Sequence, residues 1–227
     1  MKAIVSTLAV LALSSAAIAA FTFPDPPKVD APTATSKIVL AGGCFWGMQG
    51  VYEHVKGVVS TVVGYDGGKK ETAHYERIEE GDTNHAESIE VTFDPKVISL
   101  GEIYKIYFSA AHDPTTLNRQ HNDVGTQYRS SIFYNDDAQK QLAEAYIKQL
   151  NDAHVFSHAI VTKVVPNSGF FKAEDYHQHY LDQVVACGSK MTMHCMDLNV
   201  GYIRGLDIPL LNEFKAKYPE YYTDEIR

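Results

Sequence analysis

A cysteine at the start of an expected helix is the residue in this sequence best suited to nucleophilic chemistry. Cys44 follows Gly42 and Gly43 and opens a stretch with apolar residues at helical spacing. There its sulfur would lie near the helix's first backbone N–H groups and the positive end of the helix dipole, which favours the thiolate. A free cysteine is also commonly a small buried apolar residue, so position alone leaves both roles open. The neighbouring Phe45 and Trp46 favour an apolar substrate pocket.

The segment around this cysteine resembles the signature of a known enzyme family. Residues 43–47 read GCFWG, as in the A-type peptide methionine sulfoxide reductases. The resemblance continues in order over residues 37–181. The further segments similar to family motifs are GYDGG at 64–68, Tyr75 followed by GDTNHAE at 81–87, HDPT at 112–115 with Gln120, DVGTQYRS at 123–130 and AEDYHQ at 173–178.

The resemblance implies a catalytic set for reducing the S epimer of methionine sulfoxide, free or in proteins, with no cofactor and no metal. It assigns the attack on sulfur to Cys44 and protonation of the departing oxygen to Glu87. Tyr75 and Tyr128 would donate hydrogen bonds to that oxygen, and Asp123 would order the surrounding polar network. A sulfoxide oxygen leaves poorly until it is protonated, so a carboxylic acid in a pocket of low dielectric and phenolic donors suit this reaction. Outside the motifs, the same glutamate and tyrosines would be ordinary edge or core residues.

Two further cysteines could recycle the enzyme. A sulfenic acid on Cys44 must condense with another thiol, and we expect Cys187 to act first and Cys195 second, with a thioredoxin-like protein as the final reductant. The C-terminal region lacks the Gly-Tyr-Cys ending that is usual in the family. The alternative is a permanent disulfide between Cys187 and Cys195, which an oxidising compartment would permit.

Two other functions use the same residues. The first is a thiol hydrolase of the Cys-His-Asp type, with Cys44 as nucleophile and His85, His112 or His177 as base. The second is a structural metal module, but its spacing matches no compact C-x₂₋₄-C pattern. The residues that such a module would use are His177, His179, Cys187, His194 and Cys195.

Hydrophobic periodicity predicts an α+β domain in which helices cover an antiparallel sheet. The first six elements follow the order βαββαβ of a ferredoxin-like two-layer α/β sandwich, and an extra helix, an extra strand and an irregular C-terminal tail follow. Ser99 and Glu102 form an S-x-x-E capping box that marks the start of the second helix. The predicted strands are 37–41, 58–65, 88–93, 128–134 and 159–165, and the predicted helices begin near residues 44, 99 and 136.

The N-terminus resembles a secretory signal. Lys2, an apolar run and the sequence Ala17-Ile18-Ala19 predict a cleaved leader at residues 1–19, and hence export, most simply to a bacterial periplasm. Residues 20–36 contain four prolines and are expected to form an extended linker that packs poorly. We therefore assign one catalytic domain to 37–227, with a tail from about 182 that carries the candidate resolving cysteines.

Composition excludes several classes of partner and fold. The chain has 227 residues, 45% of them hydrophobic, so it can bury a globular core without a disulfide framework. Its 28 acidic and 20 basic residues give a net charge of −8, which offers no electrostatic footprint for nucleic acid. The apolar run near the N-terminus is shorter than the ~20 residues that span a bilayer, so we expect no stable membrane anchor.

Overall fold

The computed structural model describes residues 22–28, 36–187 and 208–226, with the backbone alone at 184–187. The predicted leader at 1–19 and Cys195 lie outside the described residues. In the described part of the chain, no helix combines the length and the apolar character that a membrane span requires.

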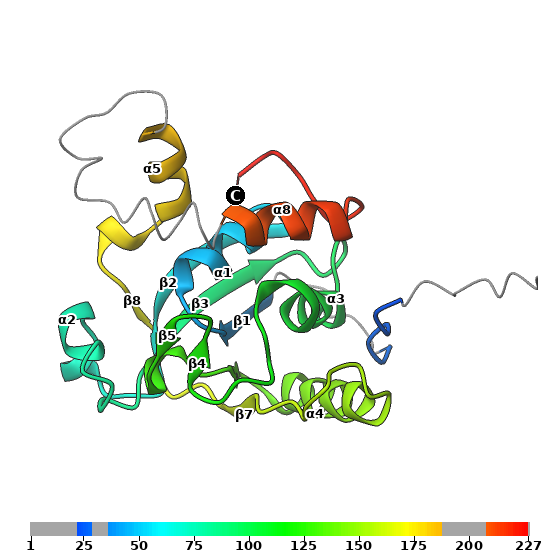
Figure 1. The fold of residues 1–227 in the computed structure, drawn as a ribbon, viewed down its shortest axis with the longest axis horizontal. Helices are drawn as coiled ribbons and strands as arrows, with labels where there is room; N and C mark the ends of the chain where they lie inside the picture. The colour runs from blue at the N-terminus through cyan, green and yellow to red at the C-terminus, as the bar shows by residue number, and fades with distance from the viewer. Residues whose placement is uncertain (1–21, 29–35, 188–207, 227) are drawn as a thin grey trace, which may run out of the picture.

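The core of the protein is a six-stranded sheet with the strand order β7-β6-β1-β3-β2-β8 (Figure 1). All neighbouring strands are antiparallel except β6 and β7, which are parallel. The central four strands, with a helix between β1 and β2 and another between β3 and β6, confirm the ferredoxin-like prediction. The strands are β1 (Ser36–Ala41), β2 (Val58–Asp66), β3 (Ala86–Phe93), β6 (Ser131–Tyr134), β7 (Lys163–Pro166) and β8 (Phe171–Lys172).

Four helices share one large apolar core with one face of the sheet. Alternate residues of β1 divide between the two faces: Ile38 and Leu40 join the large core, whereas Val39 and Ala41 join a small cluster on the other face. Because side chains alternate along a strand, this division identifies the face that the helices cover. The helices are α1 (Phe45–Tyr52), α3 (Leu100–Ile106), α4 (Asp137–Asp152) and α8 (Ile208–Lys217).

Shorter elements connect this scaffold. Helix α5 leads from the last strand toward the C-terminal part of the chain and packs against α1. These elements are η1 (Lys70–Thr72), α2 (Tyr75–Ile78), the π-helical turn η2 (Tyr107–Ala111), β4 (Arg119–Gln120), β5 (Asp123–Val124), η3 (Thr126–Tyr128), η4 (Asp175–His177) and α5 (Tyr180–Cys187).

The capping-box prediction is confirmed, whereas two strand boundaries are wrong. Ser99 caps α3, and its side chain and that of Glu102 hydrogen-bond reciprocally to backbone N–H groups. The strand predicted from Tyr128 begins only at Ser131, because Tyr128 belongs to the 3₁₀ turn η3. The strand predicted over 159–165 begins only at Lys163, since the preceding N–H groups bond outside the sheet. The Ile160 N–H donates to the Asn151 side chain of α4, and the Val161 N–H donates to the Pro114 carbonyl.

The proline-rich segment packs against the domain, contrary to our expectation of a poorly packed linker. Phe23 is only 8% exposed and belongs to the large core. The Tyr146 hydroxyl donates a 2.6 Å hydrogen bond to the Pro24 carbonyl, and Asp25 forms an ion pair with Lys105 at 2.7 Å. Although residues 22–28 have no helix or strand, this part of the segment is therefore tied to α3 and α4.

Candidate active site

Two glycines allow the chain to turn from β1 into α1 and set the position of Cys44. A Cβ on Gly42 would lie 2.7 Å from the His112 ring, and one on Gly43 would lie 2.4 Å from the Gln120 side chain. Gly43 also has a φ of +91°, which side chains disfavour. Cys44 is the N-cap residue of α1 and is half-buried, so the predicted position at the helix N-terminus is confirmed.

Glu87 lies directly beside this cysteine on β3. Its side chain is 2% exposed, and it lies in register opposite Tyr65 of β2. The Phe45 N–H donates a 3.0 Å hydrogen bond to Glu87 Oε2. Since Phe45 is the residue after Cys44, this bond fixes the carboxyl group at the same helix N-terminus as the thiol.

Tyr75, the first residue of α2, lies close enough to the Cys44 thiol and the Glu87 carboxyl group to interact with both electrostatically. Burial raises the pKa of its hydroxyl well above the ordinary value, and negative charge on Glu87, Glu79 and Cys44 raises it further. The hydroxyl therefore stays protonated at neutral pH and can donate a hydrogen bond. The structure thus brings three of the predicted residues, Cys44, Glu87 and Tyr75, into one site.

Tyr128 approaches the site from η3. Burial raises the pKa of its hydroxyl far above the ordinary value, and Glu87, Glu79 and Asp123 add to this effect. The hydroxyl donates a 3.1 Å hydrogen bond to Glu79 Oε1. Asp123, on the two-residue strand β5, is half-buried and close enough to act on the pKa of Tyr128. The 3₁₀ turn η3, which stands where we predicted the start of a strand, is thus the element that positions Tyr128.

Phe45 and Trp46 make different contacts beside the thiol. Phe45 is 1% exposed and packs in the core against Tyr65 and His177. Trp46 is half-buried, stacks on Tyr180 with ring centroids 3.9 Å apart, and donates a 3.2 Å hydrogen bond from Nε1 to His177 Nδ1. Trp46 is therefore the more accessible of the two predicted pocket residues, and direct contact with substrate remains a prediction for both.

His177 is a neutral buried imidazole that supports the aromatic residues of the site. Burial lowers its pKa to about 4. Because Nδ1 accepts from Trp46, the ring proton lies on Nε2. This atom is buried, has no hydrogen-bond partner in the described part of the chain and lies 4.0 Å from Glu174 Oε2. Its ring centroid is 4.4 Å from that of Tyr75. His177 therefore fixes Trp46 and packs against Tyr75.

Glu174 holds the start of α2 in place. Its carboxylate accepts hydrogen bonds from the Tyr65 hydroxyl at 2.8 Å and from the Tyr75 N–H at 3.0 Å. Partial burial acts to raise the pKa of Glu174, but these hydrogen bonds, those of its own backbone and the nearby His177 outweigh burial and lower it. An ionised Glu174 thus positions Tyr75.

The sequence indicated no role for Glu79, Tyr65 or Glu174, and it suggested His177 only as a hydrolase base or a metal ligand. Glu174 and His177 lie in the motif AEDYHQ at 173–178, so the motif itself was a usable signal for both. Glu79 lies in a polar stretch, and only the fold shows that the Tyr128 hydroxyl reaches it.

The histidines proposed as bases for a thiol hydrolase are engaged elsewhere. His112 uses Nδ1 with the Tyr107 carbonyl at 3.0 Å and Nε2 with Ser130 Oγ at 2.7 Å, and burial lowers its pKa to about 4. His85 Nε2 donates to the Lys69 carbonyl, and its buried Nδ1 has no hydrogen-bond partner among the residues that the structure describes. These arrangements disfavour the hydrolase interpretation.

The residues suggested for a Cys/His metal module do not converge where the structure describes them. His177 faces Trp46, whereas His179 faces Glu53. Cys187 ends α5, where only the backbone is described, and His194 and Cys195 lie outside the described residues. The resolving roles of the two cysteines therefore stay predictions.

A cysteine at a helix N-terminus, beside a buried carboxyl group and two tyrosine hydroxyls on an α+β scaffold, suits a cysteine-dependent enzyme in which the carboxyl group could donate a proton. The model of the family described as peptide methionine sulfoxide reductase matches residues 36–200, and the chain belongs to this family. The resemblance noted in the sequence is thereby confirmed.

Individual relatives agree with this assignment. The chain is 43% identical over 187 residues to "Peptide methionine sulfoxide reductase MsrA 2" of Mesorhizobium japonicum, covering 82% of this chain and 89% of the relative. A protein of the same name from Synechocystis is also 43% identical, over 87% of this chain and 88% of its own. The reduced form of Mxr1 from Saccharomyces cerevisiae is a similar solved structure, with a TM-score of 0.63 and 37% identity over 69% of this chain and 88% of that one. Methionine sulfoxide reductase A of Corynebacterium diphtheriae has a TM-score of 0.57 and 35% identity, over 66% and 74% of the two chains.

Proposed function

We propose that this protein is a peptide-methionine (S)-S-oxide reductase, which returns methionine sulfoxide, free or within proteins, to methionine. Family membership supports the reaction class. The observation that carries the proposal is the 3.0 Å hydrogen bond that fixes the buried Glu87 carboxyl group at Phe45, next to Cys44. This arrangement supplies a nucleophile and a proton donor to the two ends of one S–O bond.

In the proposed first step, Cys44 attacks the sulfoxide sulfur while Glu87 gives a proton to the oxygen. Hydrogen bonds from Tyr75 and Tyr128 would polarise the S–O bond as negative charge grows on the oxygen. The oxygen is transferred to Cys44, so the sulfoxide is reduced by two electrons to methionine and the thiol is oxidised to a sulfenic acid. Trp46 would contact the apolar part of the substrate.

The second half of the proposed cycle removes the sulfenic acid. Cys187 would attack the Cys44 sulfur, which forms a disulfide and releases the oxygen as water. Cys195 would then exchange with this disulfide, and a thioredoxin-like dithiol would reduce the product. Helix α5, which ends at Cys187, packs against α1, and Cys44 is the N-cap residue of α1. The two cysteines therefore belong to neighbouring helices.

One assay separates the reductase from the hydrolase. The purified protein with dithiothreitol is expected to form methionine from the S epimer of methionine sulfoxide and to leave the R epimer unchanged, because each type of reductase handles one epimer. Chromatography of the separated epimers measures both. Equal consumption of the epimers, or rapid acyl-enzyme formation from thiol-reactive esters without any sulfoxide reduction, would contradict the proposal.

Removing either tyrosine hydroxyl is expected to slow the first step moderately. We expect Tyr75→Phe and Tyr128→Phe each to lower the single-turnover rate by about ten- to a hundredfold, since a hydrogen bond to a charged group contributes about 1.5–3 kcal/mol. Tyr134→Phe, a change of the same type on β6, is the matched control and should leave the rate unchanged. A double Tyr75→Phe/Tyr128→Phe variant that reacts at the wild-type rate would exclude both hydroxyls from the mechanism.

Replacing both tail cysteines is expected to stop recycling and spare the first turnover. A Cys187→Ser/Cys195→Ser variant should form one equivalent of methionine per chain, then stall with a thioredoxin-like protein as reductant. Dithiothreitol should restore turnover, because a small dithiol can attack the sulfenic acid directly. Dimedone trapping and mass spectrometry should identify the sulfenic acid on Cys44.

The permanent-disulfide alternative makes the opposite prediction. If Cys187 and Cys195 only form a structural disulfide, the double variant turns over normally with the protein reductant and loses stability instead. Mass spectrometry of wild-type protein after one equivalent of substrate distinguishes the two, since a disulfide that contains Cys44 supports the relay.

We also propose that the protein is exported and acts in the periplasm. The charged, apolar and small-residue regions of residues 1–19 support this proposal. Cell fractionation should recover a shortened chain that begins at Ala20 in the periplasmic fraction. Recovery of the full-length chain with the cytosolic markers would contradict export.

A further inference from the structure

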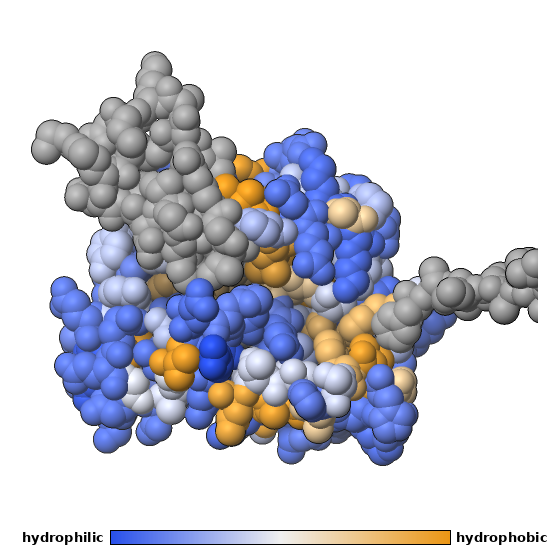
Figure 2. Space-filling view, viewed as in Figure 1, coloured by the Kyte–Doolittle hydropathy of each residue, from blue (hydrophilic) through white to orange (hydrophobic). Residues whose placement is uncertain are grey.

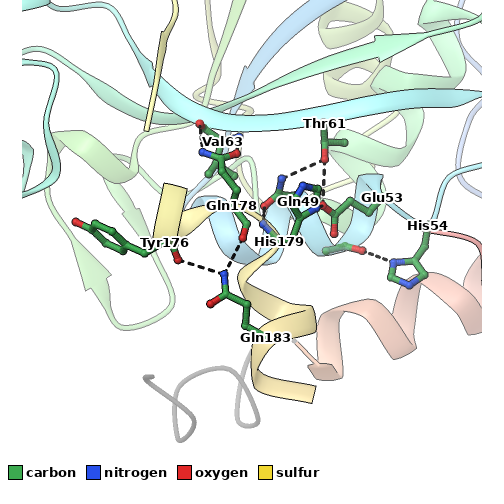
Figure 3. A network of polar contacts seen from close by, with 10 residues as sticks. Gln49, Glu53, His54, Thr61, Val63, Tyr176, Gln178, His179 and Gln183 are labelled. Atoms are coloured by element: carbon green, nitrogen blue, oxygen red, sulfur yellow. Dashed lines mark hydrogen bonds and ion pairs between the residues drawn. The ribbon is translucent and has the colours of Figure 1, made fainter. Parts of the chain in front are cut away.

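A second group of polar residues lies around the C-terminal end of α1, the end opposite to Cys44. Figure 3 shows Glu53 of this group with Thr61 and His179. Glu53, the C-cap residue of α1, is fully buried, with an exposed fraction of 0%. Its Oε1 atom accepts a hydrogen bond from Thr61 Oγ1 at 3.2 Å and lies 2.5 Å from His179 Nδ1. Its Oε2 atom is buried and has no hydrogen-bond partner among the described residues. A buried carboxyl oxygen without a partner is costly, so this atom requires an explanation.

The backbone around His179 is fixed independently of Glu53. His179 has a left-handed φ of +54°, and its N–H donates a 2.8 Å hydrogen bond to Gln49 Oε1. The side chain of Gln178 bonds to both the N–H and the carbonyl of Val63 on β2 (Figure 3). These anchors on α1 and β2 hold the His179 backbone in a conformation that costs on the order of 1–3 kcal/mol.

Asp182, in the first turn of α5, completes the group. One ligand atom from each of Glu53, His179 and Asp182 can be chosen so that all three lie within 4.8 Å of one another. Where the structure describes the chain, neither carboxylate forms an ion pair with a lysine or an arginine. Two carboxylates and one imidazole therefore converge without a permanent positive charge between them.

We propose that Glu53, His179 and Asp182 bind one divalent transition-metal cation, for which Zn²⁺ is the probe. Imidazole and carboxylate ligands suit such ions, whereas Mg²⁺ and Ca²⁺ prefer sites made of oxygen atoms alone. The cation would supply a partner for Glu53 and neutralise both carboxylates. Three protein ligands leave a fourth position of a tetrahedral ion for water.

Such an ion would join the two helices that carry the proposed redox cysteines. Glu53 is the C-cap of α1, whose N-cap is Cys44, and Asp182 lies in the first turn of the helix that ends at Cys187. The site uses neither cysteine and is separate from His177, which hydrogen-bonds to Trp46. The proposal therefore does not depend on the reductase activity.

Metal titration tests this site directly. We would use untagged protein in which the three cysteines are replaced by serine, so that thiolates cannot bind the ion. Calorimetry should show one equivalent of Zn²⁺ per chain, and X-ray absorption should show only nitrogen and oxygen neighbours, at about 2.0–2.2 Å. The thermal midpoint should rise with Zn²⁺ concentration, because binding to the folded state stabilises it by mass action.

Variants identify the ligands. His179→Ala, Asp182→Asn and Glu53→Gln are each expected to weaken Zn²⁺ binding at least tenfold. The matched controls His158→Ala and Asp175→Asn change the same residue types at exposed positions and should bind as the parent does. His179 and Asp182 are more accessible than Glu53, so their variants test the site even if Glu53→Gln folds poorly. Absence of stoichiometric binding, or binding unchanged in the His179 and Asp182 variants, would overturn the proposal.

Discussion

A Cys44→Ser variant is expected to form no methionine from methionine sulfoxide at any concentration of reductant. The serine hydroxyl has a far higher pKa than the thiol, so the N-terminal end of α1 that favours a thiolate cannot produce an alkoxide at neutral pH. Sulfenic acid chemistry is also closed to serine. Methionine formed in a single turnover, measured with excess enzyme, is the appropriate readout because it does not depend on recycling.

Controls must show that the lost activity of Cys44→Ser comes from the missing sulfur and not from a damaged site. Serine is also a favourable N-cap residue, so α1 should begin as before, and the thermal midpoint should change little. The Cys187→Ser/Cys195→Ser variant is the control, since it also loses thiols but should keep its first turnover. Full single-turnover activity in Cys44→Ser would remove Cys44 from the reaction.

Local patterns in the sequence predicted the scaffold well. Alternation over residues 88–93 predicted β3, and the Ser99–Glu102 capping box predicted the start of α3. Both signals arise from neighbours along the chain, because a strand's alternation and a helix cap depend on residues only two or three positions apart. The order of these elements then limited the topology to the observed ferredoxin-like core.

The errors arose where distant residues decide the structure. Apolar character suggested a strand from Tyr128, but Arg129 donates hydrogen bonds to the Asn84 and His85 carbonyls and holds this stretch against the start of β3. Prolines suggested a loose linker, but Phe23 finds a place in the core that α4 and α8 help to form. Neither contact leaves a periodic signal in the sequence.

The candidate site shows the same division. Cys44 could be identified from its own neighbours, whereas Glu174 and Glu79 act by hydrogen bonds to tyrosines 99 and 49 positions away in the chain. The face of the molecule shown in Figure 2 carries mainly hydrophilic side chains with several separate apolar patches. Only the fold brings acid, thiol and phenols together.

Replacing the acid while keeping its shape is expected to remove most of the chemical rate. Glu87→Gln should lower the single-turnover rate by about 10²–10⁴-fold, the usual contribution of general acid catalysis, with little effect on substrate binding. The glutamine side-chain oxygen can still accept the hydrogen bond from the Phe45 N–H that now measures 3.0 Å. The start of α1 and Cys44 should therefore stay in place, while the proton donor is lost.

A second substrate separates loss of the proton donor from loss of the thiolate. An aromatic disulfide accepts a thiolate and releases a stable thiolate, so that exchange needs no acid. Glu87→Gln should therefore react with the disulfide about as fast as wild type while it fails with the sulfoxide. Equal slowing of both reactions would mean that Glu87 acts through Cys44, and a wild-type rate with the sulfoxide would exclude it as the acid.

Because the tyrosine variants keep the acid, they should lie between wild type and Glu87→Gln in rate, and that order is what a carboxyl proton donor assisted by two phenols requires.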